Sequence, residues 1–280
     1  MGTYIVVGAY QFVGFHVTQY LLGQGEEVIG IDWEDTKTNQ YIIEEKELEI
    51  GRNANFTYLP INKLRLLDVS EPFTILLSFY DSRRGKTALK DLHINDIVSF
   101  LEKCKKNGHG NSLKIVVLLP IDADTEGFQT VLNACEGFDS VKTVYLPTIY
   151  GPWQPATMGF EAGISQLEQS TIQATLASEY REDALFIADF IEGLEQLLSS
   201  TDRSLHLKSS IDDHWNTCAK LIFKQEVIDS LPPQSPIKAT KGTVYEVPNK
   251  TSPEEGISLQ IEQNKRLNLL TKWRMRDKKD

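Results

Sequence analysis

Residues 3–32 constrain the fold more than any other part of the chain, because they combine a strand, a turn, a helix and a second strand. The residues at 4–7 are apolar and mostly β-branched, which suits a strand buried on both faces of a parallel sheet. From Phe12 the apolar spacing becomes that of a helix, and residues 27–32 form the next strand. The pattern predicts an α/β fold built on a doubly wound parallel sheet.

Two glycines, Gly8 and Gly14, bracket the turn between the first strand and the helix, and Asp32 closes the second strand. In this layout the pyrophosphate of a dinucleotide lies on the helix N-terminus, and the acidic residue takes the ribose hydroxyls. The alternative is that both glycines serve only tight helix-to-strand packing and that Asp32 is a solvated strand end. The glycine pattern alone leaves both interpretations open.

The stretch GAYQFVGFHVTQYLLGQGEEVIGID resembles the cofactor-binding opening of the NAD-dependent epimerase/dehydratase family, the extended short-chain dehydrogenases/reductases. The turn of that family reads Gly-x-x-Gly-x-x-Gly. In the family, the middle glycine lets the backbone approach the phosphates. In this chain Gln11 takes the place of that glycine. The resemblance implies a Rossmann-like fold, NAD as the candidate cofactor, and cofactor contacts at Gly8, Gln11, Phe12, Val13, Gly14 and Asp32.

The resemblance continues along nearly the whole chain. Tyr150-Gly151-Pro152 is similar to the turn that opens the family's substrate lobe, although plain turn chemistry explains the same residues. Further on, the chain resembles the family segment Arg-Asp-apolar-Val-x-Asp-apolar, in which Asp183 and Asp189 match the two aspartates. We expect Asp189 to be the N-cap of a helix. The implied organisation is a dinucleotide-binding domain at 1–150 and a smaller substrate-type lobe at 151–280, some segments of which return to the main sheet.

The catalytic half of the family pattern is missing. The family carries Ser or Thr at the end of the fifth strand and Tyr-x-x-x-Lys on the next helix, where Tyr acts as general acid/base during hydride transfer. Here the strand ends Leu118-Leu119-Pro120, and no Tyr-x-x-x-Lys occurs anywhere in the sequence. The nearest substitute ends in Arg84, four residues after Tyr80, and arginine stays protonated. We therefore assign no catalytic residue.

Composition and charge limit the classes of partner that this chain is expected to bind. The 280-residue chain carries a net charge of -10, which disfavours nucleic acid and anionic membranes. No apolar run is long enough to span a bilayer, so we expect a cytoplasmic protein. The three cysteines are dispersed and predict buried thiols, and the five histidines form no metal-ligand spacing, so we assign no metal.

Charged residues near the predicted ligand edge bear on its chemistry. The acidic run at 32–35 would repel a 2′-phosphate, which favours NAD over NADP. Four cations follow the fourth strand and indicate either a solvated loop or an anion site; they are Arg83, Arg84, Lys86 and Lys90.

Three functions remain open from the sequence. The first is a non-catalytic or weakly active relative that binds NAD or a nucleotide-like ligand in a regulatory or scaffold role. The second is an active NAD-dependent nucleotide-sugar epimerase, dehydratase or reductase with chemistry relocated to Tyr80, Tyr145 or Tyr150. The third is a scaffold that holds no ligand. The expected ligand is a dinucleotide or a nucleotide-sugar, and a homodimer is an open option.

Overall fold

The computed structural model describes residues 2–33, 40–68, 72–82, 91–108, 112–123, 128–234 and 242–277. The chain divides into two compact units. The first contains Met1–Tyr145, Leu198–His206 and Lys241–Thr243, and the second contains Leu146–Leu197, Leu207–Thr240 and Val244–Asp280. None of the helices within the described ranges is both long and apolar enough to cross a membrane.

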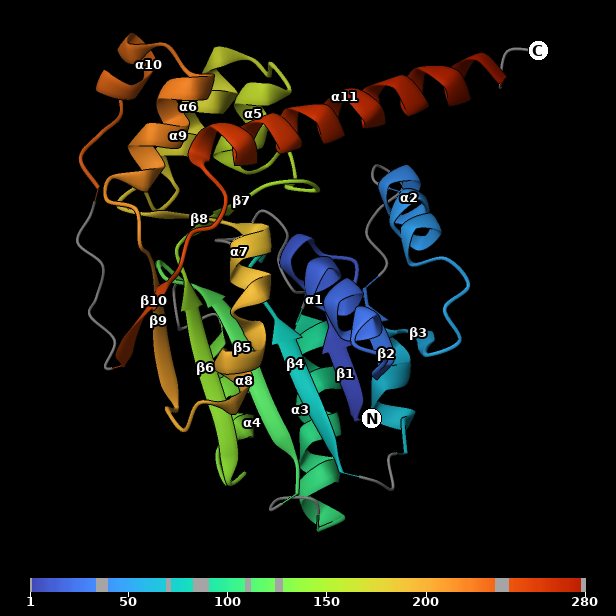
Figure 1. Cartoon of the computed structure of the whole chain (residues 1–280). Helices are drawn as coiled ribbons and strands as arrows, with labels where there is room; N and C mark the ends of the chain where they lie inside the picture. Colours follow the sequence, from blue (N-terminus) through green and yellow to red (C-terminus); the bar gives the residue numbers. More distant parts are fainter. Residues whose placement is uncertain are drawn as a thin grey trace. The chain divides into compact units, whose positions relative to one another are not determined.

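The main sheet has eight strands in the order β10-β9-β6-β5-β4-β1-β2-β3 (Figure 1). The β1–β2, β1–β4, β2–β3, β4–β5 and β6–β9 pairs are parallel. The strands are β1 (Thr3–Val7), β2 (Glu27–Asp32), β3 (Phe56–Pro60), β4 (Phe73–Ser78), β5 (Lys114–Pro120), β6 (Ser140–Leu146), β9 (Ser204–Ser209) and β10 (Thr243–Val247). The first six strands of the sheet follow the doubly wound order 3-2-1-4-5-6, so the predicted fold class is confirmed.

The order of the strands reverses between β1 and β4, and ligands of open α/β sheets bind outside the carboxyl ends of the strands at such a point. The turn after β1 and the residues after β4 therefore meet at the same edge. The helices of the first unit are α1 (Phe12–Gly23), α2 (Gln40–Ile50), α3 (Asp91–Lys106) and α4 (Gln129–Cys135), with a 3₁₀ helix, η1, at Ile61–Leu66.

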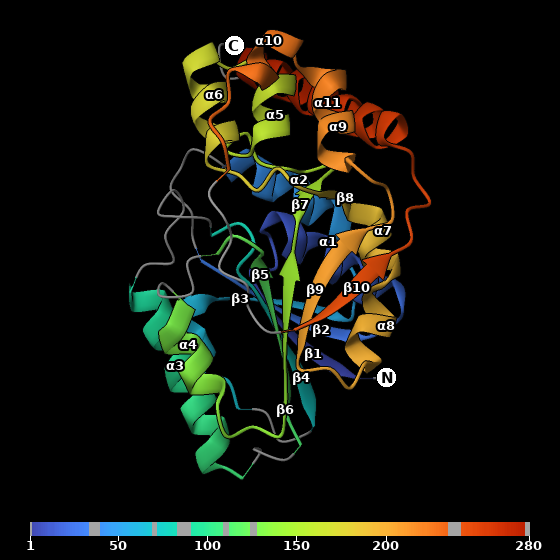
Figure 2. The ribbon, with the colours of Figure 1, turned by 90° about the vertical axis from the view of Figure 1, so that its left-hand side faces the viewer.

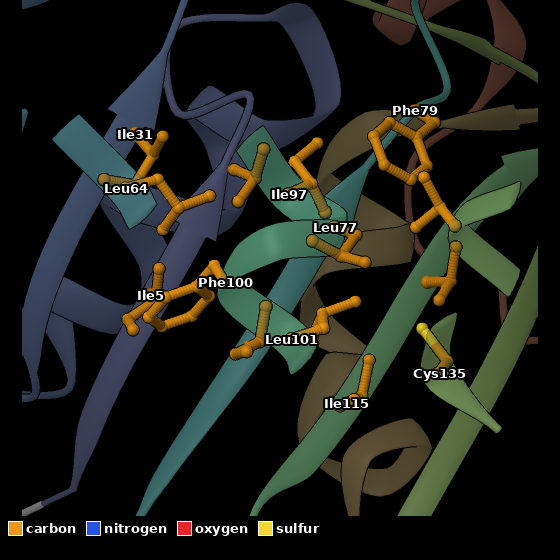
Figure 3. Packing of buried hydrophobic residues seen from close by; sticks show 14 of the residues in the cluster. Ile5, Ile31, Leu64, Leu77, Phe79, Ile97, Phe100, Leu101, Ile115 and Cys135 are labelled. Atoms are coloured by element: carbon orange, nitrogen blue, oxygen red, sulfur yellow. The ribbon is translucent and has the colours of Figure 1, made fainter. Parts of the chain in front are cut away.

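Both faces of the central strands are buried, which explains their continuous apolar runs. Alternate residues such as Ile5, Leu77 and Ile115 pack against Phe100 and Leu101 of α3 (Figure 3). The helices α3 and α4 lie on this face of the sheet, and α1 lies against the other face (Figure 2). The sheet edge that carries the glycine turn is thus held between two packed layers.

Apart from the 25-residue helix α11, the second unit is built from short elements. Its elements are β7 (Thr148–Tyr150), α5 (Gly159–Ile164), α6 (Gln169–Ala177), β8 (Ala184–Phe186), α7 (Ile187–Glu192), α8 (Leu194–Ser199), α9 (His214–Ile222), α10 (Gln225–Asp229) and α11 (Pro253–Asp277). Strands β7 and β8 form a separate parallel pair. Helix α11 begins with a capping serine: Ser252 Oγ accepts the N–H of Glu255 at 3.2 Å, and Pro253 is the first helical residue.

One predicted cap is wrong. Asp189 lies inside α7, whose N-cap is Phe186, so it does not begin the helix. Its carboxylate instead accepts from the N–H of Lys250 at 3.3 Å and from Thr251 Oγ1 at 3.2 Å. The carboxylate therefore fixes the segment that leads into α11, a distant contact that no local pattern indicates.

The close packing of α1 on the turn gives the first testable prediction. A Cβ on Gly14 would lie 1.9 Å from the carbonyl oxygen of Gly8, whereas a Cβ on Gly23 would meet nothing within 4 Å. We expect Gly14→Ala to lower the free energy of unfolding by at least about 3 kcal/mol, because backbone must move. Gly23→Ala, in the same helix, is the matched control and should cost nothing. Urea unfolding compares the two, and equal midpoints would refute the packing argument.

Candidate functional site

The turn after β1 depends on a glycine in a left-handed backbone conformation. Gly8 has φ +85°, in the left-handed region that favours glycine. Its missing side chain leaves room for Ser78 of β4, whose carbonyl oxygen would lie 2.8 Å from a Cβ at Gly8. With Gly14 packed on the Gly8 carbonyl, the helix N-terminus approaches the carboxyl end of β1 closely.

Asp32 closes β2 and points into this turn. Its side chain is only 2% exposed, so the interpretation of a solvated strand end is wrong. One carboxylate oxygen accepts the N–H of Tyr10 at 2.6 Å. The other accepts Gln11 Nε2 and the N–H of Trp33, at 2.9 and 2.8 Å. Gln11, the residue in place of the middle glycine, therefore binds the residue that would hold the ribose.

Burial dominates the electrostatics of Asp32. Desolvation raises the pKa of its carboxyl to about 6, against the hydrogen bonds from Gln11, Tyr10 and Trp33 and the charge of Lys46, which lower it. Near neutral pH the group is still mainly ionised. The hydrogen bonds within the turn stabilise the ionised Asp32 carboxylate, whereas burial alone would favour its protonated, neutral form.

Lys46, on α2, is the buried cation of the site. Its side chain is 4% exposed, its Nζ donates to the carbonyl oxygen of Tyr10 at 2.6 Å, and it lies 5.1 Å from the ring centroid of Phe15. Burial lowers its pKa to about 8, while the charges of Asp81 and Asp32 raise it. The sequence did not single out Lys46, because 40–50 shows no clear apolar face from which its burial could be inferred.

Asp81 is the second residue that sequence reasoning missed. It follows β4 at the point where the strand order reverses, and its Oδ2 accepts the N–H of Phe12, the first residue of α1. A carboxylate at a helix N-terminus is stabilised by the partial positive charge of the helix. This is the position at which the fold class binds the phosphates of a dinucleotide.

The backbone N–H groups of the turn are all paired within the chain. Those of Gly8 and Ala9 donate to the carbonyl oxygen of Ile31 at 2.8 and 3.1 Å, and that of Gln11 donates to Gly8 at 3.0 Å. Those of Tyr10 and Phe12 donate to the side chains of Asp32 and Asp81. A phosphate that accepts from Tyr10 or Phe12 must therefore replace a carboxylate of this chain.

The remaining residues that the sequence predicts near the ligand lie in the core or outside the described residues. The side chains of Phe12 and Val13 are buried in the core and contribute to the turn through their backbone. The acidic residues Glu34 and Asp35 and the cations at 83–90 lie outside the described residues, so their predicted roles stay predictions. Within the described ranges, no group of three or more His, Cys, Asp or Glu could hold a metal ion.

The end of β5, where the family resemblance implies a catalytic hydroxyl, is apolar in this chain. β5 ends at Leu118, Leu119 and Pro120, all buried, so the strand presents no hydroxyl there. The next helix, α4, has only seven residues and ends at Cys135. Two of the alternative tyrosines are also buried: Tyr80 is 0% exposed, and Tyr145 is stacked on His206 with ring centroids 4.7 Å apart.

The third alternative tyrosine belongs to a buried polar chain in the second unit. The hydroxyl of Tyr150 lies 3.0 Å from His214 Nε2, and His214 Nδ1 lies 2.7 Å from Ser209 Oγ. Ser209 Oγ donates to Asn249 Oδ1 at 2.8 Å, so it must accept from Nδ1–H, and Nε2 must accept from the tyrosine. Burial lowers the pKa of His214 to about 4 and raises that of Tyr150, which keeps both groups neutral.

Sequence and structure comparisons give different results. No family model matches the chain, and no curated protein matches it by sequence. By structure, the chain is similar to nucleotide-sugar enzymes of the short-chain dehydrogenase class. A UDP-glucuronic acid 4-epimerase from Bacillus cereus, solved with NAD and a UDP-sugar, superposes with a TM-score of 0.64 at 16% identity, over 95% of this chain and 99% of that one.

Two further structures give the same result. A dTDP-glucose 4,6-dehydratase from Bacillus anthracis, solved with NAD, has a TM-score of 0.58 at 12% identity, covering 95% of this chain and 97% of that one. A UDP-glucose 4-epimerase from Thermotoga maritima, solved with UDP-glucose, has a TM-score of 0.60 at 16% identity, covering 95% and 99%. The chain therefore has the fold of NAD-dependent nucleotide-sugar epimerases and dehydratases, as the sequence resemblance predicted.

The raised pKa of Asp32 predicts a pH dependence of stability. Between about pH 4 and 6 the folded state holds a proton on this carboxyl that the unfolded state has released, so the free energy of unfolding falls as pH rises through this window. Asp32→Asn should remove up to about 3 kcal/mol of that fall. Urea unfolding from pH 4 to 7 measures the difference, with Asp68→Asn as an exposed-charge control. Parallel curves for wild type and Asp32→Asn would contradict the assignment.

The buried chain in the second unit gives a separate prediction. Tyr150→Phe removes the hydroxyl that donates to the buried His214 Nε2 and should lower the free energy of unfolding by about 1–3 kcal/mol. Tyr245→Phe is the matched control, because its hydroxyl donates to Gln196 at an exposed site and should cost less than about 1 kcal/mol. Thermal unfolding compares them, and equal losses would show that the buried hydrogen bond adds nothing.

Proposed function

We propose that this chain is a non-catalytic relative of the nucleotide-sugar epimerases and dehydratases that binds NAD or a nucleotide-like ligand in a regulatory or scaffold role. The observation that carries the proposal is a contrast between two strand ends. The turn after β1 keeps the geometry of Gly8 and Gly14 with Asp32 at the end of β2. The end of β5 has lost the hydroxyl on which the family chemistry depends.

The residues around the turn support a dinucleotide as the ligand. We expect Asp32 to accept hydrogen bonds from the ribose hydroxyls, and the N–H groups of Tyr10 and Phe12 to donate to phosphate oxygens once their present acceptors move away. The remaining contacts predicted at Gly8, Gln11, Val13 and Gly14 would come from backbone atoms and from the Gln11 amide. Similar structures solved with NAD support this choice of ligand.

The absence of catalysis is supported by the environment of the candidate acid/base groups. NAD, when bound, supplies hydride chemistry, but a partner general acid/base must move a proton at the substrate. Tyr80 and Tyr150 are fully buried, and the hydroxyl of Tyr150 is occupied by His214. These contacts favour a binding role over an active enzyme with relocated chemistry. A homodimer and a cytoplasmic location stay predictions.

Calorimetric titration of the purified chain with NAD tests the binding half of the proposal. We expect saturable binding to the wild type and at least tenfold weaker binding to Asp32→Ala, because the ribose loses its acceptor. Asp68→Ala, which removes an exposed carboxylate, is the control for net charge and should bind as the wild type does. Absence of heat in the wild type would exclude the proposed ligand.

The catalytic half needs its own assay. Incubation with NAD and either UDP-glucuronic acid or UDP-glucose, followed by chromatography of the nucleotide-sugars, should show no product. If product forms, a series of Tyr80→Phe, Tyr145→Phe and Tyr150→Phe identifies whether a relocated tyrosine is responsible, and the non-catalytic proposal is rejected.

A further inference from the structure

The carboxylate at the N-terminus of α1 stands where a ligand phosphate would bind. Asp81 Oδ2 accepts the N–H of Phe12, the first residue of a 12-residue helix that begins directly after the glycine turn. The N–H of Tyr10, two residues earlier, is held by Asp32. The remaining N–H groups from Gly8 to Gln11 donate to backbone carbonyls. The two side-chain acceptors in the turn are therefore both anions of the chain itself.

The buried Lys46 is a second observation that supports a stable pair of carboxylates at this turn. Its ammonium group is buried on the same turn and donates to the carbonyl oxygen of Tyr10. A buried ammonium is costly unless it is balanced by negative charge. Asp32 supplies that charge from the end of β2, and Asp81 supplies it from the turn that follows β4. The turn thus holds its own anions together with their counter-cation.

We propose that Asp81 is an internal competitor for the phosphate of the ligand and sets how tightly this chain binds a dinucleotide. The inference rests on the proposed function, because it concerns the same turn. A phosphate and a carboxylate compete for the N–H of Phe12, and two anions held within a few ångströms of each other repel. NAD therefore binds only as the Asp81 carboxylate leaves the helix N-terminus.

The alternative is that Asp81 only caps α1. A cap stabilises the helix and has no bearing on ligand affinity beyond folding. The two interpretations predict different effects of removing the charge on ligand affinity. Under competition, affinity rises when the carboxylate is lost; under capping, stability falls and affinity stays the same.

The experiment compares the wild type, Asp81→Asn and Asp81→Ala by calorimetric titration with NAD and, separately, with inorganic pyrophosphate. Asp81→Asn keeps an oxygen that can accept the Phe12 N–H but removes the charge. We expect both variants to bind both probes at least tenfold more tightly than the wild type. Asp68→Asn removes an exposed charge elsewhere in the first unit and should leave the affinity unchanged.

The outcomes separate this inference from the proposed function. Equal dissociation constants in the wild type and both variants support ligand binding and overturn competition. Tight binding to the variants with none to the wild type supports competition and overturns the proposal that the natural chain binds NAD. No binding to any form overturns both.

The wild type provides a second test that does not depend on how the variants fold. Competition predicts that NAD shifts the NMR signals of the Phe12 amide and of the Asp81 carboxyl in the same titration, because their hydrogen bond breaks. Bound NAD with both signals unchanged would overturn the inference.

Discussion

The turn between β1 and α1 depends on one constraint, which is that buried backbone N–H groups must have acceptors. In an α/β protein that binds a dinucleotide, phosphate oxygens meet part of this demand. In this chain two carboxylates meet it instead: Asp32 at the end of β2 and Asp81 in the turn after β4, the two strands that flank β1. Gln11, which replaces the middle glycine, stabilises this arrangement, because its side-chain amide donates to Asp32 and helps to hold the carboxylate in place.

The same constraint explains why a lysine is buried nearby. Two carboxylates on one turn raise the local negative charge, and burial makes that charge costly. Lys46 offsets part of the cost from α2 while it satisfies the carbonyl oxygen of Tyr10. Removing any one of these groups would leave the others with an uncompensated charge, so the set is expected to be more coupled than its separate contacts suggest.

The fold could be predicted from the sequence because its signals are local. The apolar run of β1, the helical spacing from Phe12 and the acidic end of β2 each act over a few residues, and together they define the doubly wound order. The glycine turn was predicted for the same reason. The partners of the turn were not, because Lys46 and Asp81 reach it from elements that lie 36 and 69 residues away in the chain.

The failed prediction for Asp189 has the same origin. An aspartate before a helical pattern predicts a cap, yet its carboxylate binds a segment 61 residues further on. In both units, then, aspartates that local rules assign to solvent, caps or ligands are used to tie distant backbone together.

This use of aspartates also limits what resemblance can show about function. A glycine turn is preserved by packing alone, since Gly14 lies against the Gly8 carbonyl whether or not a ligand is present. The acceptors around the turn carry the functional information, because they decide whether its N–H groups remain accessible to a phosphate. In this chain those acceptors are carboxylates. The affinity for an anionic ligand therefore depends on the free energy needed to move the Asp81 carboxylate away from the Phe12 N–H at the N-terminus of α1.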